Sequence, residues 1–189
     1  TQSFHDAIRV AVTQAQNSKL VVFGVTPTQP NTGYGYLKAE FNYNEKFLLV
    51  DKFVEKPDKS TAEKYIQDGR YFWNSGMFVF EPNFFINELS MFSKDIVNAI
   101  KESCDNSIKD LDFIRLEKKS FESSPNLSVD YALMEKSKNV VMVPLDADWS
   151  DLGSWTALKD IGEKDSNGNV IKGDVISINT ENTYISSSH

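Results

Sequence analysis

The chain has 189 residues, of which 40% are hydrophobic and 25% charged, and its formal net charge is −7. This length suits one ordinary domain of roughly 100–200 residues, and the composition is that of a globular protein rather than a disordered one. The acidic balance and the lack of a basic patch argue against a nucleic-acid partner. No apolar run approaches the roughly 18 residues that a membrane span needs, so no membrane partner is expected either.

Cysteine and histidine usage narrows the chemistry further. The lone Cys104 excludes an internal disulfide and fits a reducing, cytoplasmic location. His5 and His189 are the only histidines, so neither a zinc cluster nor a Ser-His-Asp arrangement is expected.

The chain opens with a pattern typical of α/β proteins. Apolar residues recur at helical spacing from Phe4 to Ala15, which predicts an amphipathic helix. The continuous apolar run from Leu20 to Val25 is typical of a strand buried on both faces. A helix that leads into a buried strand is half of a βαβ unit, and the strand before the helix is absent. We therefore expect the chain to be part of a larger α/β domain.

A turn-rich loop over residues 26–35 is followed by two predicted strands. The strands run over Tyr36–Tyr43 and Phe47–Val54 and are expected to pair, with their connection near Asn44. The glycines at 33 and 35 bracket Tyr34 in a run that is not a dinucleotide fingerprint, because no helix follows it.

The stretch from Val54 to Phe80 is predicted to be strand, loop, helix, loop and strand. Ser60 and Glu63 form a capping box for the helix, and Gly69 occupies the position where a left-handed residue would end it. The two loops, residues 55–57 and 73–76, are expected to lie at the same edge of a sheet. Their cation, carboxylate, indole, amide and glycine together suit a sugar phosphate.

The remaining elements are shorter. A strand is predicted over Gly76–Glu81, Pro82 opens a helix, and residues 93–122 are expected to be helical in pieces. Ser128 is predicted to cap a short helix, and Val140–Pro144 reads as a buried strand.

The C-terminal part changes character. Residues 148–155 are predicted to lead into a helix that ends at Ile161, and two short β-runs follow, over 173–178 and 183–186. We expect an incomplete domain over residues 1–164 and a β-rich linker, or the start of a further domain, over 165–189.

Three polar residues of the central stretch could bind a sugar phosphate. Pro57 should hold Lys56 in an extended backbone, where its ammonium can meet a phosphate; an ordinary surface lysine is the alternative. Glu55 could accept hydrogen bonds from hydroxyls, or merely pair with Lys56. Asn74 offers a donor and an acceptor, but could equally be a left-handed turn residue.

Two further positions carry ligand hypotheses. At Gly35 the backbone could approach a ligand closely, or the glycine could serve a turn. Asp151 follows a buried strand, where open α/β sheets place ligands, and one carboxylate suits Mg²⁺ bound together with phosphates. Asp151 could instead cap the helix after Ser154. Asp130 is interpreted as a favourable charge in the first turn of its helix.

Taken in order, several motifs resemble those of the mannose-1-phosphate guanylyltransferase family (GDP-mannose pyrophosphorylases), which belongs to the sugar-1-phosphate nucleotidyltransferases. The motifs are Phe53-Val54-Glu55-Lys56-Pro57, Trp73-Asn74-Ser75-Gly76-Met77-Phe78, Ser128-Val129-Asp130-Tyr131-Ala132 and Trp149-Ser150-Asp151-Leu152-Gly153-Ser154-Trp155. Segments 23–28, 32–36, 167–170 and 173–175 are similar to the family as well.

The resemblance implies a three-layer α/β/α sandwich with a mixed, mostly parallel, Rossmann-like sheet. It implies transfer of a nucleotidyl group from GTP to mannose 1-phosphate, giving GDP-mannose and pyrophosphate, with Mg²⁺ as cofactor. On this resemblance Glu55 and Asn74 bind mannose hydroxyls, and Gly35 approaches the sugar through its backbone. Lys56 holds the sugar phosphate and Asp151 ligates the metal, so Lys56 and Asp151 are the residues expected to act in catalysis.

The chain departs from the family pattern at its start. The family's glycine-rich loop ending in Arg-Leu-X-Pro, its Pro-Lys pair and its Pro-Ala-Asp segment have no counterpart in these residues. We therefore expect the sugar-binding half of a catalytic domain, inactive by itself. A different sugar-1-phosphate nucleotidyltransferase, a non-catalytic sugar-phosphate-binding subunit and a structural domain with accidental motifs are the alternatives, and assembly as a homo-oligomer is left open.

Overall fold

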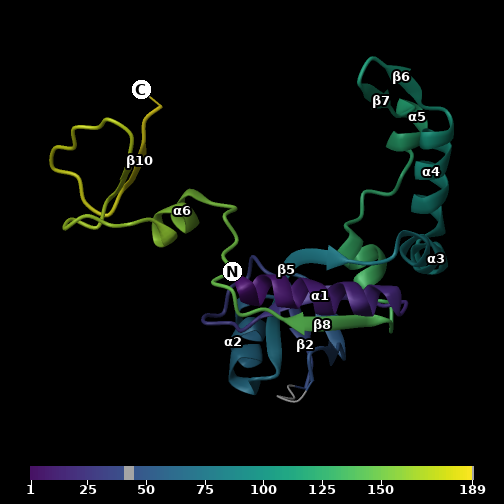
Figure 1. The fold of residues 1–189 in the computed structure, drawn as a ribbon, viewed down its shortest axis with the longest axis horizontal. Coiled ribbons are helices and arrows are strands. Elements are labelled where there is room, and N and C mark those ends of the chain that lie inside the picture. The colour runs from purple at the N-terminus through teal and green to yellow at the C-terminus, as the bar shows by residue number, and fades with distance from the viewer. Residues whose placement is uncertain (41–44, 189) are drawn as a thin grey trace. The chain divides into compact units, whose positions relative to one another are not determined.

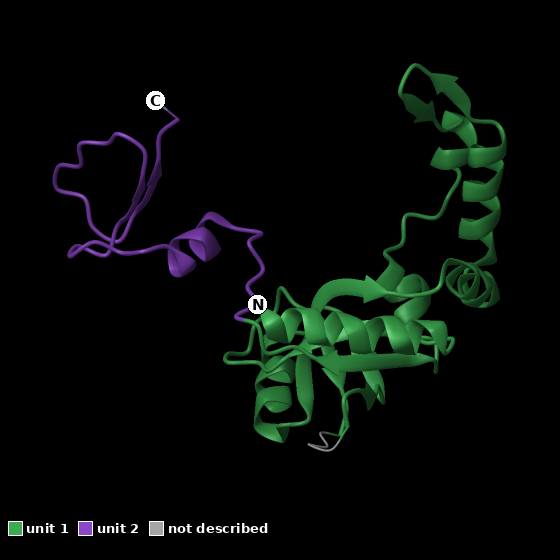
Figure 2. Ribbon diagram, in the orientation of Figure 1, with its two compact units in different colours: residues 1–147 green, residues 148–189 purple. Residues whose placement is uncertain are grey.

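The computed structural model describes residues 1–40 and 45–188, which form two compact units, residues 1–147 and residues 148–189 (Figure 2). The predicted boundary at residue 164 stays a prediction. No helix in the described part of the chain is both long and apolar enough to cross a membrane.

The first unit contains most of the secondary structure (Figure 1). Its elements are α1 (Gln2–Gln16), β1 (Leu20–Val25), β2 (Tyr36–Lys38), β3 (Leu48–Leu49), β4 (Lys52–Val54), α2 (Lys59–Asp68), β5 (Tyr71–Val79), α3 (Pro82–Phe92), α4 (Lys94–Asp105), β6 (Ile108–Asp110), β7 (Phe113–Arg115), α5 (Lys118–Glu122), η1 (Asp130–Met134) and β8 (Val140–Pro144).

The main sheet has the strand order β3-β8-β1-β5-β2-β4. Its β1–β8 pair is parallel, and the other strand pairs of this sheet are antiparallel. The predicted α/β fold with a mixed sheet is therefore confirmed, with fewer parallel pairs than expected. As predicted, β1 is buried along its length up to Val25, and the helix before it packs against β1 and β8.

Helical elements cover both faces of this sheet. On one face the core joins sheet residues such as Leu37 and Phe72 to Leu133 and Met134 of η1. Tyr36 points to the opposite face because side chains alternate along a strand. There its ring lies 5.4 Å from that of Tyr65 in α2. The sheet therefore lies between η1 and α2, which places η1 over the face that bears Leu37.

The predicted strand pair is present but shorter than expected. β2 pairs with β4 in an antiparallel register that sets Tyr36 opposite Val54. Leu48 and Leu49, predicted to belong to the second strand of that pair, instead form β3 and pair with β8. The predicted connection near Asn44 falls outside the described residues.

The helix α2 begins two residues earlier than predicted. Asp58 is its N-cap, and the Asp58 carboxylate accepts hydrogen bonds from the Thr61 amide at 2.8 Å and the Ser60 hydroxyl at 3.0 Å. Ser60 therefore lies inside the helix. The predicted capping box is wrong, because the Asp58 carboxylate, not the Ser60 hydroxyl, is the cap and accepts the Thr61 amide. The predicted stop is confirmed, since Gly69 adopts a left-handed φ of 74°.

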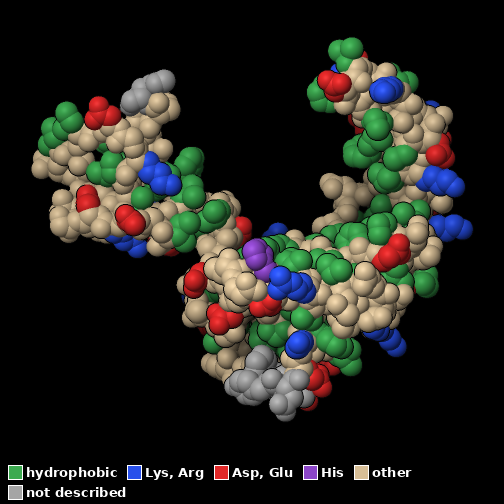
Figure 3. All heavy atoms as spheres, viewed as in Figure 1, with side chains coloured by type: hydrophobic (Ala, Val, Ile, Leu, Met, Phe, Trp, Pro, Cys, Tyr) green, Lys and Arg blue, Asp and Glu red, His purple; other side chains and the backbone are tan. Residues whose placement is uncertain are grey.

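The segment after β5 is more varied than its polarity suggested. Pro82 opens α3 as predicted, but a β6–β7 hairpin separates α4 from α5. Figure 3 shows apolar side chains among charged ones over this segment, and Leu111 and Ile114 of the hairpin are 84% and 73% exposed. Ser128 does not cap the next element, because η1 begins with Val129 as N-cap and without a side-chain cap.

The second unit is small. It contains α6 (Trp155–Ile161), which ends as predicted, and a parallel pair of β9 (Val170–Lys172) and β10 (Tyr184–Ser186). The strand predicted over residues 173–178 is not formed, because Gly173 at φ 92° ends β9 and turns the chain.

Candidate functional site

Asn74 lies inside a strand, not in the predicted loop. Residues 73–76 belong to β5, which is held between β1 and β2 and pairs Asn74 with Gly24. A register shift lies in the β1–β5 pairing just beside this point, between Val22 and Gly24. The Asn74 side chain is 8% exposed, and its Oδ1 accepts a hydrogen bond from the Gly76 amide at 3.2 Å. Strand pairing therefore overrides the turn signal of this segment.

Three predicted site residues meet at one point of the sheet. The backbone amide of Asn74 donates a hydrogen bond to the Gly35 carbonyl at 2.8 Å, which holds the end of the 26–35 loop next to β5. A Cβ atom at Gly35 would lie 2.5 Å from Glu55 Oε2 and 3.3 Å from Asn74 Cβ. The absence of a side chain at Gly35 therefore lets Glu55 and Asn74 pack closely against its backbone. We call these three residues the Gly35 cluster.

Glu55 follows β4 and turns its carboxylate into the Gly35 cluster. Its side chain is 12% exposed, and its backbone amide donates a hydrogen bond to Glu135 Oε1 at 3.1 Å. Burial raises the pKa of Glu55 above its usual value, and the Asp130 carboxylate raises it further, while Lys56 opposes both effects. Glu55 is therefore a poorly hydrated carboxylate with Lys56 as its opposing charge.

Lys56 lies beside the Gly35 cluster with its ammonium in solvent. The Lys56 Nζ atom is 3.4 Å from Glu55 Oε1, and the Lys56 side chain is 62% exposed. The predicted extended backbone is wrong, because Lys56 has a left-handed φ of 46°. This conformation costs a residue with a Cβ about 1–2 kcal/mol. Both sequence interpretations of Glu55 remain, since it pairs with Lys56 and also lies against the Gly35 backbone.

Trp73 is a core residue and not one of the groups available to a sugar phosphate. It neighbours Asn74 in β5, so its side chain points to the opposite face of the sheet. There it is 7% exposed and contacts the ring of Tyr34 edge-on at 5.1 Å between centroids. The indole therefore does not take part in the Gly35 cluster.

The predicted metal ligand lies in the second unit. Asp151 is exposed, and a Cβ atom at Gly153 would lie 3.3 Å from both of its carboxylate oxygens, so Gly153 leaves that carboxylate open. Asp151 does not cap α6, because the Ser154 hydroxyl accepts the Ala157 amide at 3.1 Å. Among the described residues, no group of three or more His, Cys, Asp or Glu is arranged to hold a metal ion.

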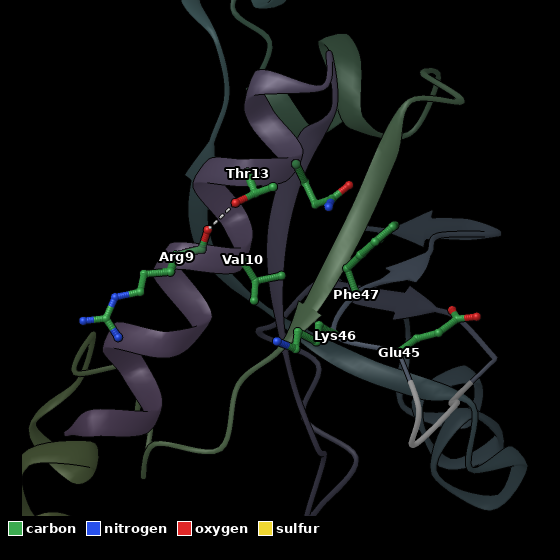
Figure 4. Close-up of a pocket in the computed structure, with 7 residues that line it drawn as sticks. Arg9, Val10, Thr13, Glu45, Lys46 and Phe47 are labelled. Carbon is green, nitrogen blue, oxygen red and sulfur yellow. Dashed lines mark hydrogen bonds between the residues drawn. The ribbon is translucent and has the colours of Figure 1, made fainter.

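A separate groove of about 520 Å³ lies between α1 and residues 45–47 (Figure 4). It is lined by Arg9, Val10, Thr13 and Gln14 on the helix side and shares no residue with the Gly35 cluster. The charge of Arg9 is already engaged by Asp6 at 2.5 Å. Figure 4 shows Arg9 pointing away from the segment that bears Lys46. We place the candidate site at the Gly35 cluster, where buried polar groups converge.

The structure adds two carboxylates that the sequence interpretation did not place at the Gly35 cluster. Glu135 hydrogen-bonds the Glu55 backbone, and Asp130 acts on Glu55 electrostatically. The motif over residues 128–132 pointed to this segment, but Asp130 was interpreted as a helix-terminal charge. No sequence signal pointed to Glu135.

Comparisons with known proteins agree with this fold. Residues 1–168 match the sequence model of a family described as Nucleotidyl transferase. The Xanthan biosynthesis protein XanB of Xanthomonas campestris pv. campestris is 47% identical over 96% of this chain and 38% of its own length. Mannose-1-phosphate guanylyltransferase of Salmonella montevideo is 46% identical over 97% of this chain and 40% of its own length. The chain thus spans about two fifths of these curated relatives.

Solved structures show the same architecture. A mannose-6-phosphate isomerase from Helicobacter pylori superposes with a TM-score of 0.73 at 34% identity, over 79% of this chain and 59% of that one. A protein described as mannose-1-phosphate geranyltransferase from Thermus thermophilus gives a TM-score of 0.75 at 28% identity, over 92% of this chain and 49% of that one.

Proposed function

Because the chain belongs to the nucleotidyl transferase family, we propose that its first unit binds the sugar 1-phosphate substrate of a guanylyltransferase. The proposed substrate is mannose 1-phosphate. The names of relatives at 43–47% identity support this choice, because several are called mannose-1-phosphate guanylyltransferase. In the whole protein the proposed reaction joins mannose 1-phosphate to GTP and yields GDP-mannose and pyrophosphate.

The observation that carries the proposal is the convergence of Glu55 and Asn74 on the backbone of Gly35. The buried carboxylate of Glu55 and the amide of Asn74 face a position where a side chain cannot fit. Sugar hydroxyls are both donors and acceptors, so they satisfy a carboxylate and an amide at once. The ammonium of Lys56 lies exposed beside Glu55, and an ammonium in solvent can pair with a phosphate.

The roles of these residues follow from the reaction. A phosphate oxygen of the sugar phosphate attacks the α-phosphorus of GTP, a new P–O bond forms, and pyrophosphate leaves. The protein needs no covalent nucleophile, so its contribution is positioning and neutralisation of charge. Glu55 and Asn74 orient the sugar ring, Gly35 lets the ring approach the backbone, and Lys56 holds the phosphate.

Asp151 is the proposed protein ligand of Mg²⁺. Mg²⁺ is commonly bound by one or two carboxylates together with substrate phosphates, rather than by a protein cage. The exposed Asp151 carboxylate, left open by Gly153, fits such a role. When bound, the cation would neutralise phosphate charge.

The test is calorimetric titration of the purified chain with mannose 1-phosphate. We expect binding to the wild type, and at least tenfold weaker binding to Gly35→Ala, because the new methyl group displaces the Glu55 carboxylate. Gly33→Ala is the matched control, since the nearest atom to its new methyl group is Asn31 Oδ1 at 3.2 Å. Equal affinities of Gly35→Ala and wild type would contradict the proposal.

Two further titrations separate the parts of the ligand. Lys56→Ala is expected to weaken mannose 1-phosphate binding but to leave the weaker binding of mannose itself unchanged. Glucose 1-phosphate, titrated in parallel, tests the neighbouring hypothesis of another sugar-1-phosphate nucleotidyltransferase. Tighter binding of glucose 1-phosphate than of mannose 1-phosphate would favour that hypothesis.

A further inference from the structure

The element that bears Asp130 is a π-turn, which is a rare form of helix. The Glu135 amide donates to the Asp130 carbonyl at 2.9 Å, five residues back along the chain. π-turns are frequent at functional sites. Leu133 and Met134 of η1 are 0% and 2% exposed and belong to the core on the Leu37 face of the sheet. This packing holds Asp130 over the face that carries the Gly35 cluster.

A chain of contacts joins Asp130 to the Gly35 cluster. The Asp130 carbonyl accepts the Glu135 amide, and the Glu135 carboxylate accepts the Glu55 amide. Glu55 in turn places Oε2 close to the Gly35 backbone, 2.5 Å from where a Cβ atom would lie. The C-terminal end of η1 is thus hydrogen-bonded to the residue that faces the proposed sugar, and Asp130 is joined to it through the backbone of the π-turn.

One carboxylate oxygen of Asp130 lacks a hydrogen-bond donor within the described part of the chain. Its Oδ1 atom is buried and has no hydrogen-bond partner among the described residues of the protein. A carboxylate oxygen accepts hydrogen bonds, and a donor on a bound ligand can satisfy this one. A phosphate cannot supply one, because its oxygens are acceptors and carry the same charge. A sugar hydroxyl can.

We propose that Asp130 is a second carboxylate acceptor for the hydroxyls of the sugar, opposite Glu55, and so a specificity-determining residue of the site. This inference rests on the proposed function, because it assumes that a sugar 1-phosphate occupies the Gly35 cluster. A site built to hydrogen-bond a hydroxyl rejects an analogue that lacks it, since the buried polar group is then left unpaired. Asp130 and Glu55 together select a sugar that presents two hydroxyls to two carboxylates.

The experiment titrates wild type and Asp130→Asn with mannose 1-phosphate and with its monodeoxy analogues, each of which lacks one hydroxyl. We expect Asp130→Asn to bind mannose 1-phosphate at least tenfold more weakly. One analogue should bind the wild type poorly and bind Asp130→Asn as well as mannose 1-phosphate does. Asp112→Asn, an exposed position in the β6–β7 turn, is the control and should bind like the wild type.

The outcomes separate this inference from the proposed function. Absence of mannose 1-phosphate binding to the wild type overturns the proposed function, and the inference with it. Equal binding to wild type and Asp130→Asn overturns the inference alone. So does a uniform loss for all analogues accompanied by a fall in Tm, which is the signature of a structural role. Mg²⁺ raising the Tm of the wild type but not of Asp130→Asn, without sugar, would also overturn it in favour of a cation.

A second set of variants keeps the test decisive if Asp130→Asn does not fold. The same analogues are then titrated against Glu55→Gln and Asn74→Ala. Dependence on a particular hydroxyl that survives both substitutions supports Asp130 as its acceptor. Dependence on no such hydroxyl overturns the inference.

Discussion

Glu55 holds a negative charge in a place that water barely reaches. Its carboxylate is largely buried, faces the Asp130 carboxylate, and has the Lys56 ammonium as its opposing charge. A group whose pKa is raised on folding binds protons more tightly in the folded state. Its contribution to stability is therefore fully present below the unfolded pKa and is lost as the pH rises through the folded pKa. At neutral pH the ionised Glu55 destabilises the fold.

This sign leads to a prediction for Glu55→Gln. The variant should have a higher Tm than the wild type at neutral pH, and the difference should shrink as the pH falls toward 4.5, the usual pKa of a glutamate. Thermal unfolding followed by circular dichroism at several pH values measures it. The exposed Glu63→Gln is the control and should leave Tm unchanged. A lower Tm of Glu55→Gln at neutral pH would sink the idea that Glu55 is kept for binding at the expense of stability.

The backbone conformation of Lys56 is not the one that its neighbour in the sequence favours. The proline that follows it favours an extended backbone, yet Lys56 is left-handed at φ 46°. The hydrogen bond of the Glu55 amide to Glu135 fixes the chain just before it. Backbone strain of this kind persists where surrounding contacts over-determine the conformation, and it clusters at functional sites.

At the scale of elements, α2 depends on the residue that caps it. Asp58 accepts the Thr61 amide, and the Thr61 and Ser60 hydrogen bonds lower the pKa of Asp58 below its usual value. Such a group stabilises the fold above its unfolded pKa, and that stabilisation is lost as the pH falls through its folded pKa. The cap is thus strongest at neutral pH.

We predict that Asp58→Ala lowers the Tm at neutral pH, because it leaves helix amides without a partner. The loss should be clearly larger than that of Ser60→Ala and should diminish in acid, where the wild-type carboxylate is protonated. Thermal melts of both variants at neutral and acid pH test this. If both variants lowered the Tm equally, the result would contradict Asp58 as the main cap and would favour Ser60, as the capping box predicted.

At the scale of the whole molecule, the residues proposed to bind the sugar and the residue proposed to bind the metal belong to different units. Gly35, Glu55 and Asn74 all lie in residues 1–147, whereas Asp151 lies in residues 148–189. The residues of the proposed sugar site therefore belong to the first unit, and the proposed metal ligand belongs to the second.

This division predicts the behaviour of Asp151→Asn. Without metal, in the presence of a chelator, the variant should bind mannose 1-phosphate with the affinity of the wild type. With Mg²⁺, any increase in affinity that the wild type gains should be lost in the variant. Calorimetry under both conditions measures the two effects, with Asp160→Asn in α6 as the control. Weaker metal-free binding by Asp151→Asn would show that the sugar site extends into the second unit.

The sequence by itself determined the features that depend on local chemistry. The apolar runs of β1 and β8, the proline that opens α3 and the glycine that ends α2 are legible because burial and backbone preference act on the residues themselves. The motifs around Glu55, Asn74 and Asp151 were likewise found as short patterns.

Only the tertiary structure decided how those patterns meet. Asn74 carries a turn signal, but pairing with β1 and β2 places it within a strand, because ladder hydrogen bonds to distant segments outweigh a local preference. The collision between a Gly35 side chain and Glu55, and the buried, unpaired oxygen of Asp130, arise from contacts between residues far apart in the chain. No local pattern encodes such contacts, so the site became visible only when the sheet and η1 brought these residues together.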